Sequence, residues 1–128
     1  MNRLSLPYRL GRARRCARKW RRRLGVEGPA TAADVELLAA RLHRLLSVRS
    51  APEIRGGTVR RTAHRPRNRA LVPLEGNERR REELAWCCGA ALFQNPVGLP
   101  WEHRHGEQDG WPHLLADEFA RTFLESRT

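Results

Sequence analysis

Hydrophobic residues recur along four segments of the chain at the three- and four-residue spacing that places them on one face of a helix. The first segment has a narrow apolar stripe that includes Trp20, and Gly25 follows it as a C-terminal cap. The second opens with a capping box on Thr31 and Asp34 and should end before Pro52. The predicted helices cover residues 8–24, 31–51, 78–94 and a last segment that begins at Pro112.

Two shorter segments between the second and third helices are predicted as strands. They cover residues 53–62, which Gly56 and Gly57 interrupt, and residues 70–74, and the basic turn between them indicates a hairpin. Residues 95–111 contain two prolines and three glycines, so a loop is expected there. The order of helix, small sheet, helix and helix predicts an α+β fold that is mostly helical, with a small β-hairpin or sheet.

The chain of 128 residues is long enough for one domain with a modest core, and its formal net charge of +11 is unevenly distributed. Residues 1–74 hold 19 basic and 4 acidic side chains, whereas residues 75–128 hold 6 basic and 10 acidic ones. Such an asymmetry indicates a basic arm or face that serves a polyanion. We therefore expect a basic N-terminal helical arm over residues 1–27 and a folded domain over residues 28–128.

The basic helix is the strongest candidate for a functional surface. Arginine binds phosphate through a planar, bidentate fork, and each neutralised phosphate releases counterions. The predicted partner is therefore a nucleic acid, with an acidic protein assembly as the alternative; codon bias in a GC-rich genome would also favour arginine over lysine. Repulsion among the cations opposes an isolated helix, so the helix should dock through Trp20 or bind an anionic partner. The candidate contacts are Arg12, Arg14, Arg15, Arg18, Lys19, Arg21, Arg22, Arg23, Arg65 and Arg67.

Cysteine content and hydropathy bear on the compartment. Three cysteines, an odd number without a secretory signal, indicate a reducing compartment, so we expect a cytoplasmic protein or one within a phage or other nucleoprotein particle. Cys87 and Cys88 are expected to be small buried residues rather than a disulfide. No apolar run approaches the length of a transmembrane helix, so no membrane insertion is expected.

Two stretches in the second half of the chain carry a family resemblance. Residues 77–92 read N-E-R-R-R-E-E-L-A-W-C-C-G-A-A-L, and residues 113–124 read H-L-L-A-D-E-F-A-R-T-F-L. They resemble the ImmA/IrrE family of zinc peptidases, in which a helix of the form E-R-R-x-x-L-A-H-E-L-G-H-x-L precedes a helix of the form E-x-x-A-x-x-F-A-x-x-L-L. The resemblance covers about residues 31–128, with one extra residue between Arg80 and Leu84, and it implies a zincin-like domain.

The zinc ligands of that family are missing from the matching positions. In an H-E-x-x-H helix the two histidines share one face and one metal ion, and the glutamate polarises the metal-bound water. Trp86 and Ala90 stand at the two histidine positions and offer no lone pair to a metal. Cys87 replaces the glutamate, and His113 stands where the family has a third ligand. We therefore expect Trp86 and Ala90 to be core residues, and we predict no bound metal and no other cofactor.

The resemblance implies a non-catalytic protein that works by binding. Active members of the family cleave helix-turn-helix repressors, and a relative without zinc ligands is expected to keep a partner-binding or nucleic-acid-binding surface and to act in transcription regulation. One alternative is a small basic structural component of a phage or other nucleoprotein assembly. Another is a metallopeptidase with atypical ligands, drawn from Cys87, His103, His105 and His113.

Overall fold

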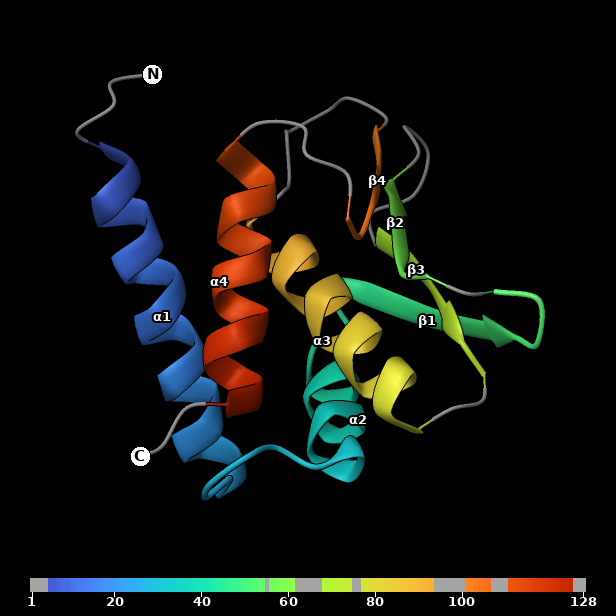
Figure 1. Cartoon of the computed structure of the whole chain (residues 1–128), viewed down its shortest axis with the longest axis horizontal. Helices are drawn as coiled ribbons and strands as arrows, with labels where there is room; N and C mark the ends of the chain where they lie inside the picture. The colour runs from blue at the N-terminus through green and yellow to red at the C-terminus, as the bar shows by residue number, and fades with distance from the viewer. Residues whose placement is uncertain are drawn as a thin grey trace.

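The computed structural model of the chain describes residues 5–54, 56–61, 68–74, 77–93, 101–106 and 111–125. In these ranges the chain forms four helices and one four-stranded sheet (Figure 1). The helices are α1 (Ser5–Leu24), α2 (Ala32–Arg41), α3 (Asn77–Phe93) and α4 (Trp111–Glu125). The strands are β1 (Leu46–Ala51), β2 (Thr58–Arg61), β3 (Asn68–Pro73) and β4 (Trp101–Arg104). The predicted α+β class, mostly helical with a small sheet, is confirmed.

The sheet is mixed and has the strand order β1-β3-β2-β4. β1 runs parallel to β3, whereas β2 runs antiparallel to both β3 and β4. The predicted pairing of β2 with β3 is confirmed, because Val59 lies opposite Ala70 and both side chains are fully buried. The turn between these strands, residues 62–67, lies outside the described residues, so the structure does not describe Arg65 or Arg67.

Several predicted boundaries are wrong, because pairing within the sheet overrides the local pattern. The second helix ends at Arg41, and the segment that was expected to continue it forms β1 instead. The predicted loop over residues 95–111 contains β4, which pairs with β2. The strand expected over residues 53–62 is limited to β2. α1 begins at Ser5 rather than at residue 8, since Pro7 is tolerated in a first helical turn, where the backbone needs no N–H donor.

α3 lies at the centre of the fold, between α4 and the sheet (Figure 1). All of its residues from Leu84 to Ala91 are buried, whereas the sequence predicted one inner face. Gly89 allows α4 to approach closely, since a Cβ atom there would lie 2.8 Å from the carbonyl oxygen of Ala116 and 3.1 Å from the Phe119 ring. The predicted apolar stripe of α4 is confirmed as buried: Leu115, Phe119 and Phe123.

Both caps predicted in the N-terminal half are confirmed. α1 ends in a Schellman motif, in which Gly25 has a φ of 69° and the N–H of Val26 donates to the carbonyl of Arg21 over 2.9 Å. Thr31 and Asp34 form the capping box that starts α2. These caps define the short connection between the first two helices.

α1 lies along α4 at the outer edge of the molecule (Figure 1).

Candidate nucleic-acid interface

One face of α1 is docked along α4. Ala13 and Ala17 are fully buried, and their small side chains let the helices pack closely. At the edge of this contact, Nη1 of Arg14 lies 2.9 Å from Oε1 of Glu118. Burial alone would raise the pKa of Glu118, but hydrogen bonds from Arg121 and Arg14 outweigh it and lower that pKa. Arg14, expected to contact a partner, therefore forms an ion pair within the protein.

Arg21 is a structural residue, and its assignment to the binding surface is wrong. Its side chain is fully buried, Nη1 donates to the carbonyl oxygen of Phe123 over 2.6 Å, and Nη2 donates to the carbonyl oxygen of Gly28. The buried face of α1 continues at four-residue spacing from Ala13 and Ala17 to this position. The guanidinium there satisfies a carbonyl in the last turn of α4, which has no helical N–H partner.

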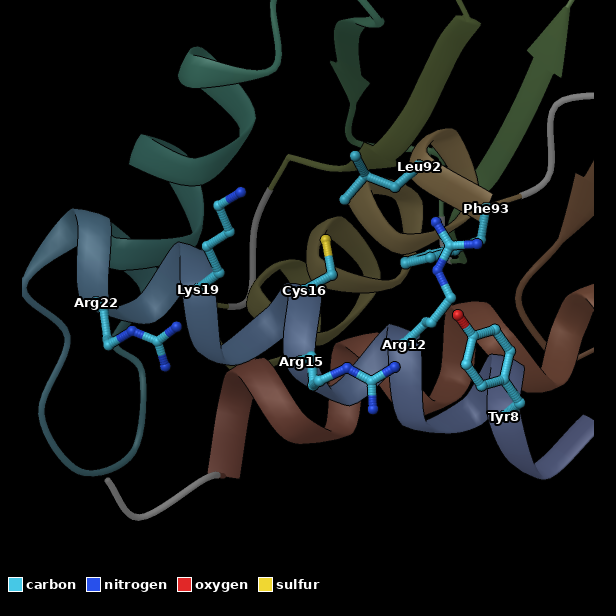
Figure 2. Close-up of a pocket in the computed structure, with 8 residues that line it drawn as sticks. All are labelled: Tyr8, Arg12, Arg15, Cys16, Lys19, Arg22, Leu92 and Phe93. Carbon is cyan, nitrogen blue, oxygen red and sulfur yellow. The ribbon is translucent and has the colours of Figure 1, made fainter.

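Another side of α1 lines a groove of about 520 Å³ next to the C-terminal end of α3 (Figure 2). The residues that line it are Tyr8, Arg12, Arg15, Cys16, Lys19, Arg22, Leu92 and Phe93. Its four cations follow one another at intervals of three or four residues, so they project from one side of the helix over about 15 Å. None of the described lining residues is acidic. The groove therefore offers an anion a row of positive charges beside two apolar side chains from α3.

An aromatic ring and a thiol complete the lining of the groove. Tyr8 is 63% exposed, and the guanidinium carbon of Arg15 lies 5.9 Å from the centroid of its ring. Figure 2 shows the side chain of Arg12 beside Phe93 at the end of α3, with Cys16 and Lys19 projecting from the same side of α1 farther along the helix. Burial raises the pKa of the Cys16 thiol, although the neighbouring cations oppose this effect. The thiol is therefore neutral near pH 7, and the charge of the groove comes from its cations.

The remaining predicted contacts lie elsewhere. Arg18 and Arg23 are exposed on α1 but do not line the groove. The guanidinium carbon of Arg23 lies 5.3 Å from the ring centroid of Trp20, which packs partly buried against the core. The predicted docking of α1 through this tryptophan is thus confirmed. Of the ten cations predicted from the sequence, the structure brings four together in the groove.

The α3 positions that match the zinc ligands of the ImmA/IrrE family lie in the core. Trp86, Cys87 and Ala90 are all fully buried, as expected for Trp86 and Ala90. Burial raises the pKa of the Cys87 thiol, so this side chain is neutral near pH 7. His113 belongs to the first turn of α4, but its side chain lies outside the described part of the structure. Among the side chains that are described, no three His, Cys, Asp or Glu residues are arranged to hold a metal ion.

A polar cluster links α3 to the turn after β4, and the sequence analysis missed it. Nδ1 of His105 lies 2.5 Å from Oε2 of Glu83, which also accepts a 2.8 Å hydrogen bond from the N–H of Gly57. The imidazole stacks on Trp86 with ring centroids 5.2 Å apart. The hydrogen bond to Glu83 raises the pKa of His105, while burial opposes it. The sequence predicts a loop here, in which His105 is either a candidate metal ligand or an exposed loop residue.

The E-R-R segment of α3 has a structural role at Arg80. Its guanidinium pairs with Glu36 of α2 through two hydrogen bonds of 2.7 and 3.0 Å. Nη1 also donates to the hydroxyl of Ser50 in β1 over 2.5 Å and to the carbonyl of Pro73 in β3 over 2.9 Å. This arginine joins three elements of the fold and is not available to a polyanion.

Searches of this chain against protein-family models, curated proteins and solved structures returned no match. The resemblance to the ImmA/IrrE family therefore depends on the sequence motifs alone. None of the helices in the described ranges is long and apolar enough to cross a lipid bilayer. α1 has 20 residues, but nine of them are arginine or lysine.

Proposed function

We propose that this protein binds nucleic acid through the groove beside α1 and has no catalytic activity. The observation that carries the proposal is the division of cations between two sides of one helix. On the docking face, Arg14 and Arg21 are paired within the protein. On the other side, four cations line a groove without acidic lining residues: Arg12, Arg15, Lys19 and Arg22.

A row of cations at this spacing destabilises the free helix. Like charges three or four residues apart repel by a few tenths of a kcal/mol per pair, and phosphate binding would remove that repulsion. Neutralising four phosphates releases their counterions, so the affinity depends steeply on salt. The logarithm of the association constant should fall against the logarithm of salt concentration with a slope of about −3.6 for a duplex or about −2.8 for a single strand.

We further propose that the protein is a non-catalytic relative of the ImmA/IrrE peptidases and has a regulatory role. Support comes from the full burial of Trp86 and Ala90, which occupy the histidine positions of the motif. Further support comes from Gly89, which matches the glycine of the family pattern and lies at the close contact with α4. Tightly bound zinc at one ion per chain, together with cleavage of a repressor, would contradict this part of the proposal.

Two other functions stay as alternatives. A small structural component of a phage or other nucleoprotein assembly would use the same groove against nucleic acid or an acidic partner protein. A metallopeptidase with atypical ligands would draw on His103 and His113, whose side chains lie outside the described residues, and on Cys87, which is fully buried. Zinc content and peptidase activity distinguish the second alternative from a binding protein.

Fluorescence anisotropy with labelled oligonucleotides tests the proposed binding. The test variant replaces three groove arginines: Arg12→Gln, Arg15→Gln and Arg22→Gln. The control variant has the same change of charge at three exposed arginines away from α1: Arg41→Gln, Arg44→Gln and Arg49→Gln. The groove variant should bind at least about tenfold more weakly than the wild type, with a salt slope smaller by about 2.7 for a duplex or about 2.1 for a single strand. Equal losses in the two variants would mean that general charge, and not the groove, attracts the ligand.

A further inference from the structure

The groove beside α1 combines its cations with an exposed aromatic ring. Tyr8 is 63% exposed, whereas Phe93, the other described aromatic residue that lines the groove, packs partly buried against the core. Tyr8 lines the groove on the same side of α1 as Arg12 and Arg15. From this arrangement we infer that the groove takes single-stranded nucleic acid in preference to a duplex, with Tyr8 as the platform on which one base stacks.

This inference rests on the proposed function, because the cations of the groove must bind phosphates. The inference adds that the nucleic acid is single-stranded. In a duplex the bases stack on one another, so an exposed phenol ring finds no free base to stack on. In a single strand every base has an open face, and aromatic side chains beside cations provide the usual platform.

Arg15 is placed to serve a base and its phosphate together. Its guanidinium lies over one face of the Tyr8 ring, with the guanidinium carbon 5.9 Å from the ring centroid. The opposite face of the ring is the one on which a base would stack, and Arg15 supplies a cation beside it for the phosphate. Leu92 and Phe93 supply apolar surface at the groove for the body of a base. The volume of about 520 Å³ is within the range of pockets that enclose small organic groups.

The packing of α1 disfavours insertion into a duplex. A recognition helix enters the major groove with its exposed face against the bases. Here α4 covers one side of α1, and the end of α3 lies beside another, so only part of the circumference of α1 is free (Figures 1 and 2).

The size of the site follows from the helix geometry. Tyr8 and Arg22 are separated by 14 residues, which correspond to about 21 Å of helix axis. At the 3.4 Å axial spacing of stacked nucleotides, this length accommodates about six of them. The groove offers charge and stacking surface, which are the same for every base, so we expect little sequence preference.

Binding of a fluorescein-labelled oligothymidylate of about twelve nucleotides, compared with a mixed-sequence duplex of the same length, tests the inference. The wild-type protein should prefer the single strand. Tyr8→Ala should weaken single-strand binding by between about 5-fold and about 150-fold and leave duplex binding unchanged. Tyr8→Phe keeps the ring and should bind as the wild type does. Because Tyr8 is exposed, neither variant should disturb folding, which circular dichroism verifies.

The possible outcomes separate this inference from the proposed function. Equal affinity for the two nucleic acids, or an unchanged affinity in Tyr8→Ala, would overturn the single-strand inference and leave nucleic-acid binding by the groove intact. Failure of the wild type to bind either one, at low salt, would overturn both proposals. Equal binding of polyglutamate would also overturn both, because it would identify an acidic protein as the partner class.

Discussion

His105 and Glu83 form a hydrogen-bonded pair in which Nδ1 lies 2.5 Å from Oε2, with the imidazole stacked on Trp86. The backbone N–H of His105 also donates to the carbonyl of Gly57 over 2.9 Å, and the N–H of Gly57 donates to the same Glu83 carboxylate. A Cβ atom on Gly57 would lie only 2.9 Å from that carboxylate and 3.1 Å from Sγ of Cys87, so a larger residue there would displace the Glu83 carboxylate. The pair thus joins the edge of the sheet to the central helix.

The stability of the protein should depend on the ionisation of this pair. The pKa of His105 is raised above 6.5 in the folded protein. The stability that protonated His105 contributes is therefore complete below pH 6.5 and is lost as the pH rises through the pKa of the folded state. Burial alone would raise the pKa of Glu83, but the hydrogen bonds from His105 and Gly57 outweigh this effect and lower the pKa below 4.5. The stability that ionised Glu83 contributes is therefore present above pH 4.5 and is lost as the pH falls through the lower folded value. The urea midpoint should therefore be highest between pH 4.5 and 6.5 and fall toward pH 8.

Glu83→Gln provides the comparison for this pH dependence. The amide oxygen still accepts the hydrogen bond from Gly57 but carries no charge to stabilise the imidazolium. Between pH 6 and 8 the variant should lose most of the decline in urea midpoint that the wild type shows. An equally steep decline in both proteins would assign the pH dependence to other groups.

Gly89→Ala should destabilise the protein by about 1–3 kcal/mol, because the new methyl group would lie 2.8 Å from the carbonyl oxygen of Ala116. Gly11→Ala in α1 is the matched control. There the nearest atom is the end of the flexible Arg15 side chain at 3.2 Å, and alanine favours helix by up to about 1 kcal/mol. Chemical denaturation measures both changes. A neutral Gly89→Ala would contradict the close contact between α3 and α4.

Arg21→Lys should lower the free energy of unfolding by about 1–3 kcal/mol, whereas Arg22→Lys should have almost no effect. The planar guanidinium of Arg21 reaches the carbonyls of Phe123 and Gly28 at once, and an ammonium group cannot reproduce that geometry. Arg22 is exposed and keeps its charge in the variant. Thermal denaturation of the two proteins side by side gives the difference. Equal stabilities would show that Arg21 does not hold the end of α4.

The elements with strong local signals were predictable from the sequence. The capping box of Thr31 and Asp34, the glycine cap at Gly25 and the apolar stripe of α4 required no tertiary information. β1 was not predicted because Leu46 also fits the helical spacing of the preceding segment, whereas its parallel pairing with Asn68 of β3 is a tertiary contact that the local pattern does not show. β4 was missed because its pairing with β2 joins residues about 40 positions apart, and no local pattern shows it.

The candidate site was predictable in composition but not in detail. The clustering of arginines pointed to α1, yet the sequence could not show which side of the helix is docked. Arg21 follows Ala17 by four residues, so the spacing places it on the buried face of α1. An arginine is rarely fully buried, however, so its residue type predicts an exposed side chain, and the structure shows full burial. The role of Phe93 in the groove depends on where α3 ends relative to α1, which only the folded structure shows.

The resemblance of α3 to a zinc-binding helix can be tested by restoring its histidines. In Trp86→His/Ala90→His, two imidazoles would stand one helical turn apart. The side-chain volume lost at position 86 is offset by the volume gained at position 90. Zinc at about 100 times its dissociation constant should raise the stability of this double variant by about 2.7 kcal/mol and leave the wild type unchanged. Trp86→His alone is the control, because one imidazole from α3 binds zinc weakly. If the double variant folds and zinc does not alter its melting temperature, α3 does not have the geometry of the peptidase helix.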